Sequence, residues 1–368
     1  MPDKSFFITG GGTGGHIYPA VAIADLIIEK FSDAKLYYVG NPNNMEAGIV
    51  KLKPYVFLPV VSSGMPRKLG VSCFLWLVRM FLATVKCCYY ILKYKPSVVF
   101  GTGGYVSAPV LCAAKFLRIP FVMHDCDVNP GLVTRKLAPF AKSVSVAFES
   151  AKDKLDSDRV FVNGNPIRRE FSTVTKEQAR EKLGLGDKLT LCVMGGSQGA
   201  KTINSAVSKV IKSLIEKYDI QVIFQTGKKN YDETLKELKI VWPEFEDCKN
   251  LIVKPYFSEM VYVLAASDIA VSRAGSLSIS EICSTGLAAI FIPYPYAAAD
   301  HQRKNAKFME EKGAGVYLED SDASSQRLYD EIVSLITDIS KLDSISNCAK
   351  SLAKNDAAER ILSQIIGE

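Results

Sequence analysis

Apolar residues gather in short runs along the chain, and most stretches between these runs place apolar residues at helical spacing. Short apolar runs are typical of buried strands, and their alternation with helices indicates a parallel sheet with helices on its faces. In the first half we expect strands at residues 6–10, 36–40, 56–60, 98–102, 121–125, 143–148 and 160–164. In the second half we expect strands at residues 189–194, 221–226, 251–256, 269–272, 289–293 and 315–318.

This repeated plan predicts an α/β chain of two doubly wound parallel-sheet domains. The join is expected near residues 164–171, where Gly-Asn-Pro interrupts regular structure and charged residues follow. The first domain is therefore expected to end at residue 165. Sheets of this kind bind ligands at the carboxyl ends of their strands, so two facing domains would place these ends across a cleft.

Composition and charge narrow the class of protein. The 368 residues are 48% hydrophobic and 23% charged, which is typical of a globular protein with real cores. The net charge of +6 does not require nucleic acid as a partner, but it permits attraction to anionic lipid or phosphate. The nine cysteines form no C-x-x-C pair, and most lie in apolar runs, which indicates reduced thiols in the cytoplasm. The chain leads directly into its first strand, so we expect no signal peptide.

Three glycine-rich turns follow expected strands and precede expected helices. The first, residues 10–16, reads GGGTGGH and ends in His16, one of three histidines in the chain. The others are GTGGYVS at 101–107 and GGSQGA at 195–200, where the hydroxyl of Ser197 can donate to phosphate. Free N–H groups at a helix start suit an anionic or strongly polar ligand, so the first two turns could together hold a diphosphate. The alternative is tight strand-to-helix packing with no ligand.

Further polar groups follow later strands. His124, Asp125 and Asp127 form a mixed cluster that suits sugar hydroxyls, or the orientation of a base, better than a metal ion. Glu281 lies about one and a half turns into an expected helix, where it either binds ribose hydroxyls or faces solvent. Gln302 and Asn305 are three residues apart, so they share one helix face and could bind a hexose.

Residues 72–94 form an unusual helical segment that is apolar almost all round. Its cations recur every seven residues and so form one basic stripe, and two more cations precede it; these residues are Arg79, Lys86, Lys93, Arg67 and Lys68. Three cations make a transmembrane span costly. The segment is either a buried crossover helix with a solvated basic edge, or a face that docks on an anionic membrane surface.

Six blocks occur in order between residue 8 and about residue 307: GGGTGGHIYPAVAIA, GTGGYVSAP, GNPIRREF, GGSQGAKTIN, RAGSLSISEI and DHQRKNA. Together they resemble the UDP-N-acetylglucosamine:lipid I N-acetylglucosaminyltransferases of bacterial cell-wall synthesis. The resemblance implies the two-domain GT-B fold, with a first domain that binds the lipid-linked acceptor, lipid I. The second domain, residues 166–341, would bind UDP-GlcNAc, and a C-terminal helical segment at 342–368 would rejoin the first. It also implies a peripheral protein on the cytoplasmic face of the cell membrane, with no cofactor, no metal and no nucleic acid.

The same resemblance assigns roles residue by residue. His16 is the first choice of base, because an imidazole can accept a proton near neutral pH, and Asp125 is the second. Glu281 would hold the ribose, Arg168 would lie near the diphosphate or the hinge, and Phe257 would offer backbone groups to uracil. The implied UDP-GlcNAc site comprises Thr13, Gly14, Gly15, Asp127, Arg168, Ser197, Phe257, Ser276, Leu277, Glu281 and Gln302. The implied site for the acceptor diphosphate comprises Gly11, Gly12, Gly14, Gly103, Gly104 and Tyr105.

The chain departs from the family pattern near its fifth expected strand. His-Glu-Gln-Asn is common where residues 124–127 read His-Asp-Cys-Asp, and asparagine is common at Thr134. The expected reaction is an inverting displacement, in which the 4-hydroxyl of the muramyl sugar attacks the anomeric carbon and UDP leaves. The alternatives are a related glycolipid glycosyltransferase, a UDP-GlcNAc 2-epimerase, and a sugar-nucleotide-binding protein without activity.

Overall fold

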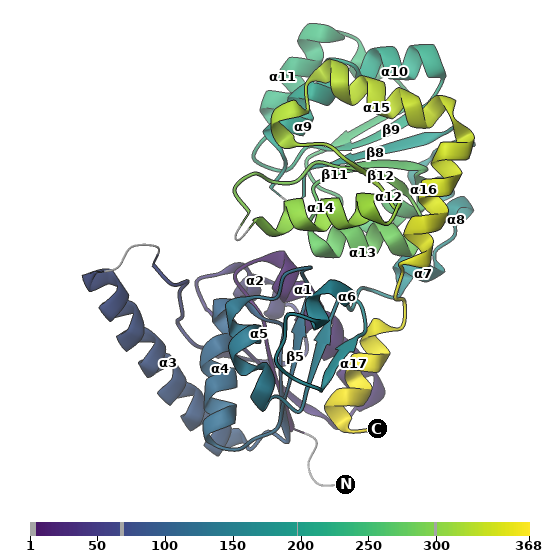
Figure 1. The fold of residues 1–368 in the computed structure, drawn as a ribbon. Helices are drawn as coiled ribbons and strands as arrows, with labels where there is room; N and C mark the ends of the chain where they lie inside the picture. Colours follow the sequence, from purple (N-terminus) through teal and green to yellow (C-terminus); the bar gives the residue numbers. More distant parts are fainter. Residues whose placement is uncertain (1–4, 67–69, 197, 298–299) are drawn as a thin grey trace. The chain divides into compact units, whose positions relative to one another are not determined.

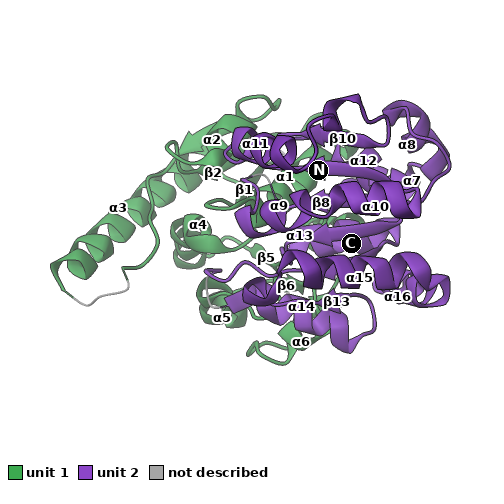
Figure 2. Cartoon of the chain, turned by 90° about the horizontal axis from the view of Figure 1, so that it is seen from above, with its two compact units in different colours: residues 1–167, 354–368 green, residues 168–353 purple. Residues whose placement is uncertain are grey.

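The structure is a computed structural model (Figure 1), and it describes residues 5–66, 70–196, 198–297 and 300–368. The chain forms two compact units, one of residues up to Ile167 together with Lys354–Glu368, and one of Arg168–Ala353. Figure 2 shows the units in separate colours. Each unit has its own parallel sheet, so the expected pair of doubly wound α/β domains is confirmed.

The first unit is built on a sheet of seven parallel strands in the order β3-β2-β1-β4-β5-β6-β7. These strands are β1 (Ser5–Thr9), β2 (Lys35–Gly40), β3 (Val56–Pro59), β4 (Val98–Gly101), β5 (Phe121–Asp125), β6 (Ser143–Val146) and β7 (Val160–Val162). Its helices are α1 (Gly14–Lys30), α2 (Met45–Val50), α3 (Val71–Tyr94), α4 (Gly104–Phe116), α5 (Leu132–Leu137), α6 (Glu149–Lys152) and α17 (Ala357–Ile366).

Successive side chains of a strand point to opposite faces of the sheet, and β1 is buried on both. Phe6 and Ile8 belong to one core cluster, which α1 and α17 cover. Phe7 belongs to the other, which α3, α4 and α5 help to cover. This two-sided burial explains why the strand reads as a continuous apolar run in the sequence.

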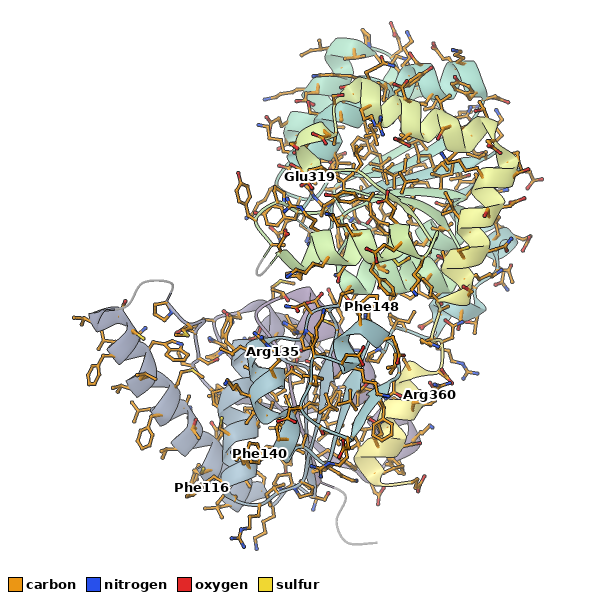
Figure 3. All side chains as sticks on the ribbon, viewed as in Figure 1. Phe116, Arg135, Phe140, Phe148, Glu319 and Arg360 are labelled. Atoms are coloured by element: carbon orange, nitrogen blue, oxygen red, sulfur yellow. The ribbon has the colours of Figure 1, made fainter. Side chains whose placement is uncertain are left out.

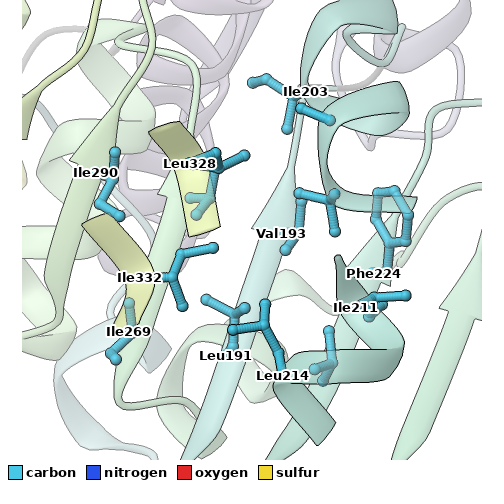
Figure 4. Close-up of a cluster of buried hydrophobic side chains, with 14 of the residues drawn as sticks. Leu191, Val193, Ile203, Ile211, Leu214, Phe224, Ile269, Ile290, Leu328 and Ile332 are labelled. Carbon is cyan, nitrogen blue, oxygen red and sulfur yellow. The ribbon is translucent and has the colours of Figure 1, made fainter. Parts of the chain in front are cut away.

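The second unit repeats the plan with six parallel strands in the order β10-β9-β8-β11-β12-β13. They are β8 (Thr190–Met194), β9 (Gln221–Gln225), β10 (Leu251–Lys254), β11 (Ile269–Ser272), β12 (Ala288–Phe291) and β13 (Val316–Tyr317). Its helices are α7 (Glu170–Thr173), α8 (Lys176–Leu183), α9 (Lys201–Ser208), α10 (Ile211–Tyr218), α11 (Tyr231–Val241), α12 (Met260–Ala266), α13 (Ser276–Thr285), α14 (His301–Glu311), α15 (Ser325–Thr337) and α16 (Ile339–Ser351). Figure 4 shows one core of this unit, where Leu191 and Val193 of β8 lie among Phe224 of β9 and Leu328 and Ile332 of α15.

The C-terminal segment expected at 342–368 is divided between the units. Leu342 and Ile345 of α16 are buried in the core of the second unit. Ile361 and Ile365 of α17 are buried against α1 in the first unit. The amphipathic pattern is helical in both parts, but each part buries its apolar face on a different sheet.

Helix α3 contradicts the expectation of a buried crossover helix. Only Ala83, Cys87 and Ile91 are buried, which is one seam at spacing i, i+4, i+8. Phe74 and Phe81 are 66% and 67% exposed, and the cations Arg79, Lys86 and Lys93 are exposed as well. Figure 3 shows side chains that extend outward along α3. Phe116 and Phe140 of the same unit, which are labelled there, are exposed as well. Arg67 and Lys68, the two cations that precede the helix in the sequence, lie outside the described residues.

Candidate functional site

The glycine-rich turns lie where the strand order of each sheet reverses. In the first unit β1 pairs with β4, and Thr9 is in register with Gly101, so the turns after these strands start at the same level. In the second unit Met194 of β8 is in register with Ser272 of β11. The carboxyl ends of strands at such a reversal are where doubly wound sheets bind their ligands. Each unit therefore has one candidate site formed by two neighbouring turns.

His16 lies in the first turn of α1 with a half-buried ring. Its Nδ1 lies 2.8 Å from the carbonyl oxygen of Thr102, which follows β4. A carbonyl oxygen only accepts hydrogen bonds, so Nδ1 carries the hydrogen and, in the neutral ring, Nε2 keeps its lone pair. The hydroxyl of Thr102 in turn donates to the carbonyl oxygen of His16 at 2.5 Å. The turn after β4 thus fixes the orientation of the His16 ring, and Thr102 is a neighbour of His16 that sequence reasoning missed.

Gly104 makes room for this arrangement. A Cβ there would lie 3.0 Å from Cδ2 of His16 and 3.0 Å from the carbonyl oxygen of Gly11. The φ of Gly104 is +73°, a left-handed conformation that side chains disfavour. Two of the expected diphosphate residues, Gly103 and Gly104, therefore also lie directly against the imidazole.

Asp125 ends β5 and is buried. Its Oδ2 accepts from the N–H of Gly131 at 2.9 Å, and its Oδ1 accepts from the N–H of Asp127 at 3.3 Å. Burial raises the pKa of this carboxyl group, and neighbouring Asp127 raises it further. These contacts hold the loop after β5, so they favour a positioning role for Asp125 over that of base. Asp127 itself is half-buried in that loop.

Cys126 lies between these acids, with its Sγ 4.0 Å from Nδ1 of His16. The thiol is buried, and this burial raises its pKa well above the ordinary value. Cys126 is therefore a neutral neighbour of the imidazole rather than a thiolate.

His124 is fully buried and contacts protein atoms through both ring nitrogens. Nδ1 lies 3.1 Å from the hydroxyl of Ser145, and Nε2 lies 2.9 Å from Oδ1 of Asn165. Burial lowers the pKa of His124 to about 4, so the ring is neutral at physiological pH. Because both nitrogens are engaged, His124 orders the Gly-Asn-Pro segment instead of binding a ligand. Within the described residues no group of three or more His, Cys, Asp or Glu side chains could hold a metal ion.

The other expected residues of the first unit surround the same turns. Thr13 is the exposed N-cap of α1, and the half-buried Gly14 and Gly15 open its first turn. The hydroxyl of Tyr105 accepts a hydrogen bond from Nδ2 of Asn44 at 3.1 Å. The N–H of Gly12, expected to face a diphosphate, donates to the carboxylate of Glu46 at 3.3 Å. Glu46 therefore belongs to this site, although nothing in its sequence neighbourhood indicates that.

In the second unit, the turn after β8 leads into α9 and the turn after β11 leads into α13. Ser197, expected to contact a phosphate, lies outside the described residues. Arg273 fixes the second turn, because its guanidinium donates to the carbonyl oxygens of Ile292 and Pro293 and pairs with Asp320. The start of α13 is thus tied to the loop after β12, and Arg273 is a third residue, after Thr102 and Glu46, that sequence reasoning missed.

Glu281 lies in the second turn of α13 with a half-buried side chain. Burial raises its pKa to about 7, and the guanidinium of Arg168 opposes this shift. A carboxyl group that has a pKa near 7 and lies beside a cation is typical of a ligand-binding site. Arg168 is exposed and close enough to influence Glu281, so these two expected residues do act on one another.

The remaining expected residues of this unit are partly engaged. The N–H of Phe257 donates to Oε1 of Gln225 at 2.9 Å, which leaves contact with a base to its carbonyl oxygen. Oε1 of Gln302 accepts from the N–H of Tyr294 at 2.9 Å, so a further interaction of this amide as a donor would use its NH₂ group. Ser276 is buried and Leu277 half-buried at the start of α13.

Comparison with protein families decides the classification. The N-terminal domain of glycosyltransferase family 28 matches residues 6–146, and the C-terminal domain of the same family matches residues 190–361. The chain belongs to glycosyltransferase family 28. The two matches correspond to the two sheets, so both units have a counterpart in family 28.

Individual relatives support the assignment of the chain to glycosyltransferase family 28. A protein of Caldanaerobacter subterraneus named UDP-N-acetylglucosamine--N-acetylmuramyl-(pentapeptide) pyrophosphoryl-undecaprenol N-acetylglucosamine transferase is 39% identical over 97% of both chains. The crystal structure of MurG from Acinetobacter baumannii is 25% identical, covers 100% of both chains and has a TM-score of 0.77.

A UDP-GlcNAc 2-epimerase from Neisseria meningitidis has a TM-score of 0.68 over 99% of this chain and 100% of that one. It is only 14% identical, so it shows the shared fold alone.

Proposed function

We propose that this protein transfers N-acetylglucosamine from UDP-GlcNAc to the 4-hydroxyl of the muramyl sugar of lipid I, which yields lipid II with a β-1,4 link. The observation that carries this proposal is the full-length relationship to transferases of that name, at 39% identity over 97% of the chain. Each unit has a pair of neighbouring turns that lead into helix N-termini, which suits an acceptor and a donor that both contain a diphosphate.

On the acceptor side, His16 is the base. Its Nδ1–H is held by the carbonyl oxygen of Thr102 at 2.8 Å, so Nε2 accepts the proton of the attacking hydroxyl. As the new bond to the anomeric carbon forms, the bond to the UDP oxygen breaks and the configuration inverts. Asp125 supports this geometry by holding the loop that carries Cys126 against the imidazole.

On the donor side, the departing UDP gains negative charge that the second unit stabilises. The N-termini of α9 and α13 point their free N–H groups at the turns after β8 and β11. Arg168 adds a cation, and Glu281 accepts from the ribose hydroxyls. Ser276, Leu277 and the amide of Gln302 contact the sugar, while the carbonyl oxygen of Phe257 contacts the uracil.

Helix α3 docks the protein on the cytoplasmic face of the cell membrane. By length and composition it could also cross a membrane, and it is the one helix among the described residues that meets this test. Its exposed cations favour docking instead, because they meet anionic headgroups while the apolar rings enter the lipid. The cations also lie near tyrosine rings, with Lys86 Nζ 5.7 Å from the ring centre of Tyr90 and Lys93 Nζ 5.8 Å from that of Tyr89. Docking through this surface would bring the protein to the membrane, where its lipid-linked acceptor lies.

Release of UDP that depends on the acceptor tests the proposal. The protein is incubated with UDP-GlcNAc and, in separate reactions, with a short-chain lipid I analogue, with diacylglycerol or with no acceptor. We expect UDP only with the lipid I analogue. Release with diacylglycerol would indicate a different glycolipid transferase, conversion of the donor without acceptor would indicate the epimerase, and donor binding without UDP release would indicate a protein without activity.

A further inference from the structure

Glu46 is a buried carboxylate that the proposed reaction does not use. It is 0% exposed, although it lies in the first turn of the short surface helix α2. A buried carboxylate is costly unless hydrogen bonds compensate for its lost hydration. Its position therefore requires donors, and the structure supplies them from the neighbourhood of His16.

Three N–H groups donate to Glu46. The backbone N–H of Gly12 donates to Oε2 at 3.3 Å, and the backbone N–H of Asn41 donates to Oε1 at 3.1 Å. The side-chain amide of Asn44 donates to Oε1 at 3.4 Å. The carboxylate thus ties the turn after β1 to the loop after β2.

The shape of the turn is adapted to this carboxylate. A Cβ at Gly11 would lie 2.5 Å from Oε1 of Glu46, and a Cβ at Gly40 would lie 3.0 Å from its Cγ. Any side chain at Gly11 would therefore displace the carboxylate. Gly11 supplies space for Glu46, a need independent of any bound anion.

The network continues to the start of α4. Nδ2 of Asn44, which contacts Glu46, also lies 3.1 Å from the hydroxyl of Tyr105. The ring of Tyr105 packs on Gly12, since a Cβ at Gly12 would lie 3.0 Å from Cε1. Glu46 thus connects, directly or through Asn44, the two segments that carry the acceptor-diphosphate residues, which are the turn after β1 and the start of α4.

We propose that Glu46 is a positioning residue that fixes the first glycine turn and Tyr105 for the acceptor, an inference that rests on the proposed function for its kinetic consequence. Its two oxygens matter as well as its shape, because both accept hydrogen bonds from N–H groups, whereas an amide has only one oxygen that accepts. Glutamine at this position would direct an NH₂ group at the N–H of either Gly12 or Asn41. One donor would then be buried without an acceptor.

The test compares Glu46→Gln and Asn44→Ala with the wild type and with the control Asp25→Asn. Asp25 is in the same unit, where its carboxylate makes an exposed ion pair with Lys53. Two measurements are made: amide hydrogen exchange at Gly12 and Asn41, and steady-state kinetics with UDP-GlcNAc and a short-chain lipid I analogue. Asn44→Ala removes the link to Tyr105 while the buried carboxylate remains. This variant therefore tests the proposal even if Glu46→Gln folds poorly.

For Glu46→Gln we expect faster exchange at both amides and an acceptor KM raised about tenfold, with the donor KM unchanged. For Asn44→Ala we expect a smaller rise in the acceptor KM, of about threefold. Asp25→Asn should match the wild type in both measurements. The proposal would be overturned if the amide of Gly12 in Glu46→Gln exchanged its hydrogen as slowly as in the wild type. Equal rises of the acceptor KM and the donor KM would overturn it as well.

Failure of the proposed function has a different signature. A wild-type protein that releases no UDP with the lipid I analogue would contradict the transferase activity. The exchange measurement would still decide whether Glu46 holds the turn, because it does not depend on turnover.

Discussion

Glu281 offers a quantitative test of the donor site through pH. Burial raises its pKa to about 7, so the carboxyl group is close to half protonated at neutral pH. Ribose hydroxyls donate to the ionised form, so a proton on Glu281 competes with UDP-GlcNAc. Because the folded-state pKa is raised, the folded protein holds this proton above the pH at which an unfolded chain loses it. Stability contributed by Glu281 therefore falls as pH rises from about 4.5 through about 7, whereas donor affinity rises as pH passes through about 7.

The size of the effect follows from this pKa. If only the ionised form binds, the apparent Kd exceeds its limiting value by a factor of one plus ten to the power of pKa minus pH. With a pKa of about 7, this factor is about 11 at pH 6 and about 1.1 at pH 8. Donor affinity should therefore rise about tenfold between these pH values, which corresponds to about 1.4 kcal/mol.

Isothermal titration calorimetry of UDP-GlcNAc at pH 6, 7 and 8 measures this dependence. The diphosphate of this ligand is esterified at both ends, so it does not titrate in that window. Glu281→Gln should bind more weakly at pH 8 and should lose the tenfold dependence. The control Glu311→Gln removes an exposed glutamate of α14 and should keep it.

Two results would refute this reasoning. A wild-type Kd that stays flat between pH 6 and pH 8 would mean that Glu281 does not titrate against the donor. An undiminished pH dependence in Glu281→Gln would assign the titration to another group.

Further predictions concern the acceptor side and the membrane. His16→Ala should lower kcat by about 10²- to 10⁴-fold with little change in the Kd of UDP-GlcNAc by calorimetry, and an equal loss of donor affinity would contradict its role as base. Asp125→Asn should lower the Tm, because the carboxylate of Asp125 holds the loop after β5. If this variant kept the wild-type Tm but lost turnover, Asp125 would be the base instead of a positioning residue. Gly104→Ala should cost about 1–3 kcal/mol in urea unfolding, because its φ is strained for alanine, and an unchanged midpoint would contradict this. Sedimentation with anionic vesicles should show reduced binding at an unchanged Tm when glutamine replaces the three exposed cations of α3, and unchanged binding would remove the docking claim; these cations are Arg79, Lys86 and Lys93.

The sheets could be predicted because their central strands, such as β1, β4, β8 and β11, are buried on both faces. Runs such as residues 98–102 and 189–194 are apolar or small throughout, and each overlaps a strand of the structure. The positions of the glycine turns follow from the same plan, since each turn comes directly after a strand. The neighbouring positions of the turns after β1 and β4 follow from the order of strands in a doubly wound sheet.

The contacts within the site could not be predicted in the same way. Glu46 lies in the polar sequence NPNNMEAG, which is typical of a solvated loop, and only the fold brings it against Gly12. Arg273 reads as a surface cation, yet it is buried by carbonyl oxygens from a distant loop. Hydrogen bonds between residues far apart in sequence leave no local periodicity, so residue patterns do not reveal them.

Helix α3 shows a different limit. Apolar composition normally indicates burial, but this helix exposes Phe74 and Phe81 and buries only one seam. Composition reports the environment that a side chain prefers, whether that environment is protein or lipid. From the sequence alone, residues 72–94 could therefore belong either to a protein core or to a membrane surface, and the pattern does not distinguish the two.

Analysis of the reaction product tests the transferase activity most directly. The protein is incubated with a short-chain lipid I analogue and UDP-GlcNAc labelled with carbon-13 at the anomeric position, and the lipid product is examined by mass spectrometry and NMR. The predicted product carries one added N-acetylhexosamine, with the label in a β-anomeric carbon bonded to the 4-oxygen of the muramyl sugar. A lipid without label, an α-anomeric link, or label found only in an epimerised UDP-sugar would contradict the proposed function.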